Sequence, residues 1–279
     1  MVIKLAPTHK IDFFVDNIMR EHLDKVRYRV LKKDFDFVTI IDGREGSGKS
    51  VLAQQLASYL DPTFSLNNIV FTSDDFIKKI KDPKTKKGAC IILDEAFNSI
   101  NSRASMSAVN KSMGAVATEM RQKNLFIIIV LPSFFDLDKQ FAIHRASSLI
   151  HVYLKDDVNR GQYLIFPRSK KLYLYLAGKK TYNYSKPKSP FPPCRFTNHY
   201  IVDEQEYRLK KSQAFKKRTV SNQARNWLGQ RNSYIKFIIK TMNLTQKEIA
   251  DVPTNYGVVP VGERQIGRIL EEMGVFDGG

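Results

Sequence analysis

Short apolar runs recur along the first half of the chain and are separated by stretches with helical spacing. The first run, Phe35–Asp42, has the length and composition of a buried strand. Four similar runs follow it, namely Ile69–Phe71, Cys90–Leu93, Leu125–Leu131 and Ser148–Leu154. Strands that alternate with helices form parallel sheets whose two faces are both covered. The pattern therefore predicts an α/β fold with a parallel sheet and helices on both faces.

Two helices are predicted from apolar positions that repeat every three or four residues. One covers residues 11–23, ahead of the first strand, and the other runs from about Ala108 to Arg121, before the fourth strand. After residue 154 the pattern changes. The segments Gly161–Pro167 and Lys171–Ala177 each have a strand-like pattern and flank a short basic link. This arrangement predicts a β-hairpin.

The C-terminal part begins with a proline-rich stretch and continues as helices. Four prolines within Ser185–Pro193 disfavour regular structure and predict a linker. We divide the chain into an N-terminal helical segment, a core, a basic β-hairpin extension, a linker and a basic helical region that holds a helix-turn-helix-like domain. Their residues are 1–34, 35–155, 156–184, 185–195 and 196–279.

Positive charge is concentrated in the middle of this 279-residue chain. The net charge is +17, and residues 155–236 hold 19 Lys and Arg against 5 Asp and Glu. Such a stretch attracts a polyanion. Nucleic acid is the first interpretation, an anionic membrane surface the second, and a merely solvated basic face the third.

The composition bears on the cellular compartment that we expect for the protein. The longest apolar run, Leu125–Leu131, is far too short for the roughly 20 residues of a membrane span. No secretion signal is recognisable at the N-terminus, and two cysteines do not make a disulfide framework. We therefore expect a soluble protein of the reducing cytoplasm, without a membrane span.

Residues 43–50, GREGSGKS, match the phosphate-loop pattern GxxxxGK(S/T) between a predicted strand and a predicted helix. Gly46 and Gly48 lack a Cβ, which allows the backbone N–H groups of the loop to surround a phosphate. Lys49 supplies a charge for the β- and γ-phosphates, and the Ser50 hydroxyl is placed to bind Mg²⁺. The predicted nucleotide-binding residues are Gly43, Arg44, Glu45, Gly46, Ser47, Gly48, Lys49, Ser50 and Val51.

Two acids follow the third predicted strand. Asp94 comes at its carboxyl end, where it can hold the Mg²⁺ shell, and Glu95 can polarise an attacking water. Together with the loop they predict an ATPase that uses ATP and Mg²⁺. Ser133, after the fourth strand, is either a γ-phosphate sensor or a turn residue.

Three arginines, Arg103, Arg121 and Arg145, are candidates for an arginine finger. Arg121 ends the helix before the fourth strand and Arg145 precedes the fifth, so either could act on a neighbouring subunit's nucleotide. The alternative for each is an ordinary surface arginine near a helix C-terminus.

These motifs resemble those of a known group. The segments GREGSGKS and CIILDEAF, and the stretch from Gly114 to Leu154, are similar to P-loop ATPases of the additional-strand, catalytic-glutamate class. Within that class they resemble the FtsK/HerA-like translocases, the zonula-occludens-toxin-like proteins and viral DNA-packaging ATPases. The resemblance covers about residues 35–154.

The resemblance implies a specific sheet order and a specific activity. The Leu125–Leu131 strand should separate the Phe35–Asp42 strand from the Cys90–Leu93 strand. The family also implies a homo-oligomeric ring, usually of six subunits, that moves nucleic acid through a central pore with ATP. Family members usually end the fourth strand with Gln or Asn, whereas this chain has Leu131, Pro132 and Ser133 there.

The C-terminal tail can be interpreted as a helix-turn-helix module or as a packing module. In the first interpretation its third helix presents Arg264, Gln265 and Arg268 to DNA. Lys170 and Lys171, which lie among tyrosines, are further candidates for nucleic-acid contacts, or else belong to the solvated face of the hairpin.

Three functions compete. The leading hypothesis is a Mg-ATP-dependent motor that moves DNA. The second is an ATP-gated switch that assembles on DNA and recruits or loads another enzyme, which would be a further protein partner. Small-molecule phosphotransfer is third, because no acceptor pocket is recognisable in the sequence.

Overall fold

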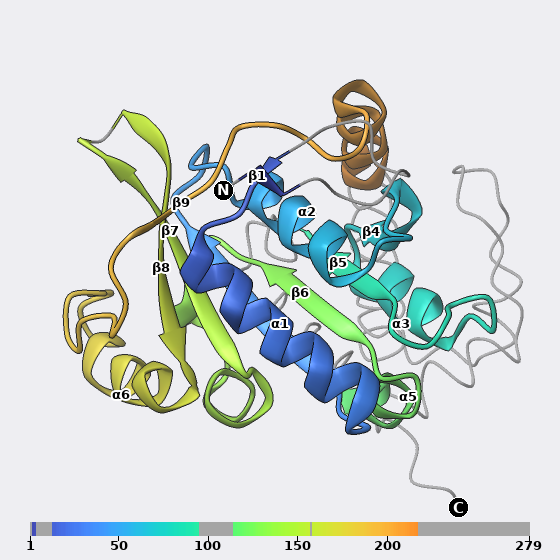
Figure 1. Cartoon of the computed structure of the whole chain (residues 1–279), viewed down its shortest axis with the longest axis horizontal. Helices are drawn as coiled ribbons and strands as arrows, with labels where there is room; N and C mark the ends of the chain where they lie inside the picture. The colour runs from blue at the N-terminus through green and yellow to red at the C-terminus, as the bar shows by residue number, and fades with distance from the viewer. Residues whose placement is uncertain (1, 4–12, 95–113, 157, 217–279) are drawn as a thin grey trace, which may run out of the picture. The chain divides into compact units, whose positions relative to one another are not determined.

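The computed structural model describes residues 2–3, 13–94, 114–156 and 158–216 (Figure 1). The chain divides into two compact units, Met1–Lys211 and Ser212–Gly279. The first unit holds the sheet and the helices that cover it. Of the second unit, the described residues are 212–216, which are helical.

A seven-stranded sheet forms the centre of the first unit, with the order β4-β5-β6-β3-β7-β8-β9. In chain order its strands are β3 (Phe37–Gly43), β4 (Ile69–Val70), β5 (Cys90–Leu93), β6 (Phe126–Val130), β7 (Ser148–Lys155), β8 (Asn159–Pro167) and β9 (Cys194–Arg195). The first five in spatial order are parallel, and β7, β8 and β9 pair antiparallel. The order confirms the prediction that β6 separates β3 from β5.

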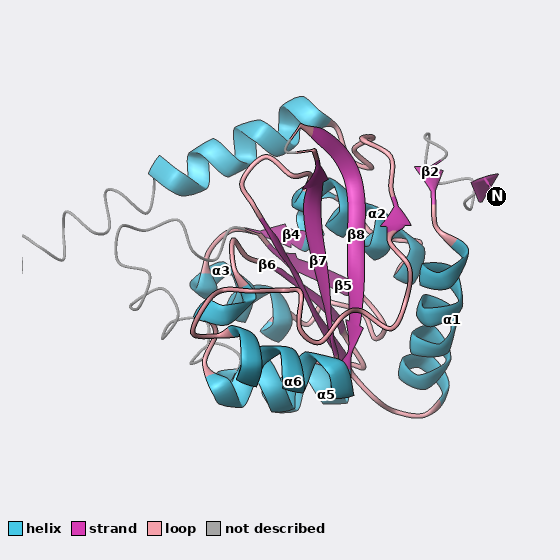
Figure 2. Ribbon diagram, turned by 90° about the vertical axis from the view of Figure 1, so that its left-hand side faces the viewer, coloured by secondary structure: helices cyan, strands magenta, loops and turns pink. Residues whose placement is uncertain are grey.

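Helices cover both faces of this sheet, as Figure 2 shows with α1 and α2 to the right of the strands. The helices are α1 (Asn17–Lys32), α2 (Lys49–Leu60), α3 (Ser73–Lys81), α5 (Ala117–Gln122) and α6 (Arg168–Gly178). Short turns of helix are η1 (Leu66–Asn68), η2 (Phe134–Asp136) and η3 (Phe141–Arg145), and β1 (Val2–Ile3) pairs with β2 (Phe13–Phe14).

Alternate side chains along the strands pack on opposite faces of the sheet and form the hydrophobic core. Ile127 and Ile129 of β6 join one hydrophobic cluster together with residues of α3, α5 and α6. The neighbouring strand β3 contributes Val38 and Ile40 to the same cluster. Successive strand residues point to opposite faces. Because both sets of β6 side chains are buried, the sheet is covered on both faces, as the continuous apolar runs predict.

The N-terminal helix differs from its prediction. Residues 13–14 are a strand, and α1 begins at Asn17, where the Asp16 carboxylate accepts a 3.0 Å hydrogen bond from the Ile18 amide. Asp is a favoured N-cap residue because its side chain satisfies an amide that the helix leaves free. The apolar face then continues beyond residue 23 to Val26 and Val30, so the helix starts later and is longer than the sequence pattern indicates.

The predicted hairpin is wrong in its second half. Gly161–Pro167 lies within a strand, but that strand, β8, pairs with β7, and Lys171–Ala177 lies within helix α6. The leucines alternate with tyrosines and mimic a strand. The buried positions of α6, however, are Lys171, Leu174, Tyr175 and Gly178, spaced three and four apart. Pro167 at the N-cap ends the strand and begins the helix.

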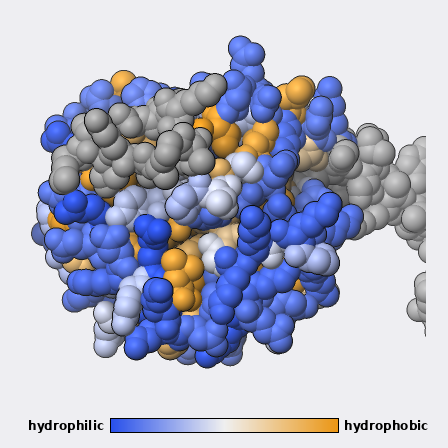
Figure 3. Space-filling model, turned by 45° about the vertical axis from the view of Figure 1, so that its right-hand side comes forward, coloured by the Kyte–Doolittle hydropathy of each residue, from blue (hydrophilic) through white to orange (hydrophobic). Residues whose placement is uncertain are grey.

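None of the helices in the described part of the chain combines the length and the apolarity that crossing a lipid bilayer requires. On the face shown in Figure 3, hydrophilic side chains cover most of the surface, and hydrophobic ones gather in small groups.

Candidate nucleotide and magnesium site

The glycine-rich loop connects the carboxyl end of β3 to the first residue of α2. A Cβ on Gly43 would lie 2.0 Å from the Val152 carbonyl oxygen of the neighbouring strand. Gly46 and Gly48 have φ angles of +75° and +97°, which side chains disfavour. Glycine at these positions therefore lets the backbone pass close to its neighbours and adopt the conformation that a phosphate-binding loop requires.

Helix α2 begins at Lys49 with Gly48 as its N-cap, and no side chain caps it. The first amides of a helix lack intrahelical partners and carry the positive end of its dipole, so this end favours an anion. The Lys49 ammonium lies over the loop and donates hydrogen bonds of 2.6 and 2.7 Å to the carbonyls of Gly43 and Arg44. The predicted phosphate-binding charge is thus held at the loop.

The hydroxyl of Ser47 is a further polar group inside the loop. Its residue is fully buried, and its oxygen has no hydrogen-bond partner among the described residues. A buried hydroxyl without a partner carries a desolvation penalty. It supports the presence of a ligand oxygen at this loop.

Asp94 and Ser50 meet beside the loop. The Ser50 hydroxyl donates a 3.2 Å hydrogen bond to Oδ1 of Asp94, and the carboxylate is almost completely buried. A hydroxyl and a carboxylate oxygen are ligands that Mg²⁺ prefers, either directly or through its waters. The two residues that the sequence assigns to the metal therefore lie together, and their donor set fits Mg²⁺.

A residue that the sequence did not indicate completes this cluster. Tyr207 belongs to the helical residues 204–211, and its hydroxyl donates a 2.5 Å hydrogen bond to the second oxygen of Asp94. Burial raises the pKa of Tyr207, and the Asp94 charge raises it further, so the phenol keeps its proton and donates. Because 113 residues separate Tyr207 from Asp94, no local pattern could have shown the contact.

The segment before Tyr207 covers the loop and helix α2. A Cβ on Gly48 would come within 2.9 Å of the Phe196 ring, and the Gln55 amide donates to the carbonyls of Thr197 at 2.7 Å and His199 at 2.9 Å. On the other side, the Nη2 atom of Arg160 in β8 lies 3.7 Å from the position of a Cβ on Gly46. Phe196 and Arg160 are thus loop neighbours that sequence reasoning missed.

A buried polar network lies at the carboxyl end of β3. Asp42 is fully buried and accepts hydrogen bonds from the Phe134 amide at 2.8 Å and from the Tyr184 hydroxyl. Nδ1 of His151 lies 2.9 Å from its other oxygen. The position of Asp42, at the end of a buried strand like that of Asp94, is a signal that could have pointed to it.

Ser133 follows β6 and acts as a capping residue in this structure. Its hydroxyl accepts a 3.2 Å hydrogen bond from the Phe135 amide at the start of η2. This is the turn chemistry that was the alternative to a γ-phosphate sensor.

Arg121 and Arg145 lie at the opposite edge of the sheet from the loop. Arg145 precedes β7 and forms an ion pair with Asp36, which precedes β3. Arg121 precedes β6, and its guanidinium lies 5.6 Å from the centre of the Phe35 ring. The structure therefore does not bring either arginine to the phosphate loop of its own chain.

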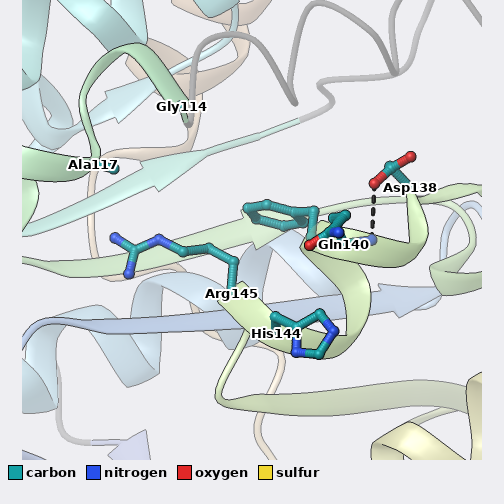
Figure 4. A pocket seen from close by; sticks show the side chains of 7 residues that line it. Gly114, Ala117, Asp138, Gln140, His144 and Arg145 are labelled. Atoms are coloured by element: carbon teal, nitrogen blue, oxygen red, sulfur yellow. Dashed lines mark hydrogen bonds between the residues drawn. The ribbon is translucent and has the colours of Figure 1, made fainter.

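A cavity of about 350 Å³ lies at this amino edge (Figure 4). Its lining includes Asp138, Gln140, His144 and Arg145, together with Ala117 at the start of α5. Asp138 accepts a 2.8 Å hydrogen bond from the Gln140 amide, shown dashed in Figure 4, and so caps its own turn. The cavity is separate from the predicted phosphate site.

The structure places the two lysines predicted to contact nucleic acid in different environments. Lys170 is exposed on α6. Lys171 is fully buried, and its ammonium donates to the carbonyls of Ala142 and Ile143, so its prediction as a nucleic-acid contact is wrong. The prediction failed because residues 168–178 form a helix, and Lys171 lies on the face of that helix that is turned toward the core. Glu95, Arg103, Arg264, Gln265 and Arg268 lie outside the described residues.

The sheet order and the loop together define the fold of the P-loop nucleoside triphosphatases. β3 leads into the phosphate loop, β5 is followed by Asp94, the predicted metal ligand, and β6 lies between them. In a parallel α/β sheet, ligands bind at the carboxyl ends of the strands. The loop, Ser50 and Asp94 all lie at that edge.

Comparisons with known proteins leave the family open. No family model matches the chain, and no curated protein matches its sequence. The N-terminal domain of zonular occludens toxin from Neisseria meningitidis is 17% identical, with a TM-score of 0.34, over 48% of this chain and 84% of that one. A structure described as the basis for katanin self-assembly is 11% identical, with a TM-score of 0.36, over 71% of this chain and 82% of that one. The fold assignment stands on the sheet order and the loop alone.

Proposed function

We propose that this chain is a Mg²⁺-dependent ATPase that moves DNA, as a motor of the FtsK/HerA type that hydrolyses ATP at subunit interfaces. The contact between Ser50 and Asp94 beside the phosphate loop carries the ATPase part of the proposal. A loop alone binds phosphate, whereas hydrolysis also needs a metal held against the terminal phosphates.

Each part of the site has a role in this mechanism. The loop amides and Lys49 bind and orient the phosphates, and Ser50 and Asp94 hold the metal. Bound Mg²⁺ would neutralise the charge that develops on the phosphate oxygens. Glu95, the next residue after Asp94, is the residue that we assign from the sequence to orient and polarise the attacking water.

The DNA part of the proposal is supported by the exposed basic residues of α6 and of the segments on either side of it. Residues 158–202 contain nine Lys and Arg and no Asp or Glu. Except for Lys171, these basic residues are exposed, and the aromatic rings of Tyr173, Tyr182 and Phe191 lie among them at the surface. Positive charge neutralises phosphates, and exposed rings stack on bases. We expect this surface to contribute to DNA binding.

The proposal includes a homo-oligomer, in which the amino-edge arginines would have a role. A finger for the loop of the same chain would have to lie at the carboxyl edge, whereas Arg121 and Arg145 lie at the amino edge. In a homo-oligomeric ring, such residues would act on the nucleotide of a neighbouring subunit. The ring belongs to the proposal because the sequence resembles ring-forming translocases.

Steady-state ATP hydrolysis with and without DNA tests the proposal. We expect DNA to stimulate turnover, and DNA binding to weaken steeply as the salt concentration rises. Lys49→Ala should abolish nucleotide binding, whereas Glu95→Gln should retain binding and stop turnover. If DNA does not stimulate ATP hydrolysis and does not bind in a salt-dependent way, the result contradicts the motor.

The contact between Tyr207 and Asp94 favours one alternative, an ATP-gated DNA-binding switch that recruits or loads another enzyme. In such a protein, nucleotide controls assembly rather than movement. Displacement of a protein roadblock from DNA during ATP hydrolysis distinguishes the two, because a switch assembles without directional motion.

A further inference from the structure

Both oxygens of the Asp94 carboxylate are engaged by the protein itself. Oδ1 accepts from Ser50 at 3.2 Å, and Oδ2 accepts from Tyr207 at 2.5 Å. The Tyr207 residue is 2% exposed, so its hydroxyl reaches Asp94 from a packed position. Its ring lies 5.8 Å from that of Phe71 and 5.5 Å from that of Tyr200.

This hydroxyl competes with the metal that the site fits. Mg²⁺ requires six oxygen ligands in nearly regular octahedral geometry and keeps several of its waters. An aspartate that holds it must therefore turn a free carboxylate oxygen toward the metal or its waters. As long as Ser50 donates to Oδ1 and Tyr207 to Oδ2, each oxygen keeps only one acceptor site for the metal or its waters.

The helix that carries Tyr207 is anchored on both sides of this contact. Before it, the Gln55 side chain donates to the backbone of residues 197 and 199. After it, the Lys210 ammonium donates hydrogen bonds of 2.8 and 2.7 Å to the carbonyls of Leu66 and Ile69. These anchors contact groups away from the metal, so the segment can stay attached while the helical turn that carries Tyr207 loosens and its hydroxyl leaves Asp94.

We propose that residues 196–211 form a latch over the metal site, in which the Tyr207 hydroxyl holds Asp94 until Mg²⁺ with its nucleotide displaces it. The latch rests on the proposed function in that it requires the loop to bind a magnesium nucleotide. The helix continues along the chain into residues 212–216 of the second unit.

Nucleotide titration of the full chain with Mg²⁺ and with EDTA tests the latch. Tyr207→Phe keeps the ring and removes the competing hydroxyl. Because Mg²⁺ then has no hydrogen bond to a charged group to displace, the Kd for a fluorescent ADP with Mg²⁺ should fall by at least about tenfold. With EDTA the two proteins should bind ADP equally, because the hydroxyl competes with the metal rather than with the phosphates.

Tyr200→Phe is the matched control, since it removes a hydroxyl from the neighbouring ring and leaves the hydrogen bond of Tyr207 in place. It should bind Mg-ADP like the wild type. An unchanged Kd in Tyr207→Phe overturns the latch. A weaker Kd with Mg²⁺ also overturns it, because the hydroxyl would then support Asp94 instead of competing.

Hydrogen–deuterium exchange provides a readout besides affinity. In the wild type, Mg-ADP should increase amide exchange in residues 204–211, whereas ADP with EDTA should not. Tyr207→Phe should show the increase without ligand. Protection of these amides by Mg-ADP contradicts the latch. If the wild type binds no nucleotide, the proposed function itself fails and the latch with it, whereas nucleotide binding with unmoved exchange and affinity rejects the latch alone.

Discussion

The carboxyl and amino edges of the parallel sheet both hold polar groups, but they use them differently. At the amino edge most of these groups contact one another: Arg145 pairs with Asp36, and the Lys123 ammonium donates hydrogen bonds of 2.8 Å to the carbonyls of Ile80 and Asp82. Nε of Arg145 and Oδ1 of Asn124 lack a partner among the described residues, but no glycine-lined loop or helix N-terminus adjoins them. At the carboxyl edge, Ser47 has a buried hydroxyl without a partner among the described residues. The glycines there keep side chains away from the loop.

This difference separates structural polar groups from functional ones. A group whose partner is a neighbouring strand or turn stabilises the fold. A group that is buried at a loop of positive-φ glycines and beside a helix N-terminus is placed for a ligand. Burial alone would not have distinguished them, because Asp42, whose oxygens are held by the Phe134 amide, Tyr184 and His151, is as buried as Asp94.

The largest expected effect comes from filling the space at Gly43. A Cβ there would lie 2.0 Å from a backbone oxygen, and φ is +142°. Gly43→Ala should therefore lower the free energy of unfolding by about 3 kcal/mol and remove nucleotide binding. Gly114→Ala is the matched control at the amino edge, because a Cβ there meets no atom of the described residues within 4 Å.

Chemical denaturation and ADP titration of both variants measure this contrast. Gly114→Ala should change the free energy of unfolding by less than about 0.5 kcal/mol and bind ADP normally. Equal stability of the two variants would mean that the loop does not pass β7 as closely as the structure indicates.

The part of the site that the sequence predicted is the part that adjoins strand ends. The loop, Ser50 and Asp94 each follow an apolar run, and parallel strands bring their carboxyl ends to one edge. Tyr207, Phe196 and Arg160 come from segments beyond the parallel strands. Their contacts depend on how those segments pack against the loop and α2, which no local periodicity encodes.

A smaller effect is expected at the ion pair of the amino edge. In Arg145→Met the Asp36 carboxylate, whose side chain is 12% exposed, loses its partner. We expect a loss of about 2 kcal/mol in the free energy of unfolding, and Asp36→Asn in the same chain should recover part of it. Thermal and denaturant unfolding of the single and double variants measure both changes.

The same variants sharpen the comparison of the two edges. Nucleotide binding should be unaffected, since Arg145 does not adjoin the loop of its own chain. If Arg145 acts on a neighbouring subunit, ATP turnover should stay low in the double variant even where stability returns. Turnover that recovers together with stability would assign Arg145 a structural role only.

Lys171 shows why helix and strand were confused after residue 167. The segment alternates leucine and tyrosine like a strand, and its lysines resemble a basic face. Its helical phase becomes visible only when Leu174, Tyr175 and the buried Lys171 pack against η3 and the strands. Tertiary packing therefore overrode the local pattern, and the basic residue turned inward.

The last effect, no larger than that of the ion pair and spread over two pH units, is a pH dependence that comes from this lysine. Burial, with a contribution from Arg168, lowers the pKa of Lys171 from 10.5 to about 8. Between these two values the unfolded chain binds more protons than the folded one, so the free energy of unfolding due to Lys171 rises with pH. Below pH 8 the folded lysine is also charged, and the penalty is constant.

Denaturant unfolding at pH 7.5, 8.5 and 9.5 isolates this contribution. The wild type should gain up to about 2 kcal/mol over this range relative to Lys171→Met, at 1.4 kcal/mol for each full pKa unit. Lys170→Met, which changes the exposed neighbour on α6, should follow the wild type. If Lys171→Met follows it as well, the ammonium is solvated in the folded chain, and the nucleic-acid role that its burial excludes becomes open again.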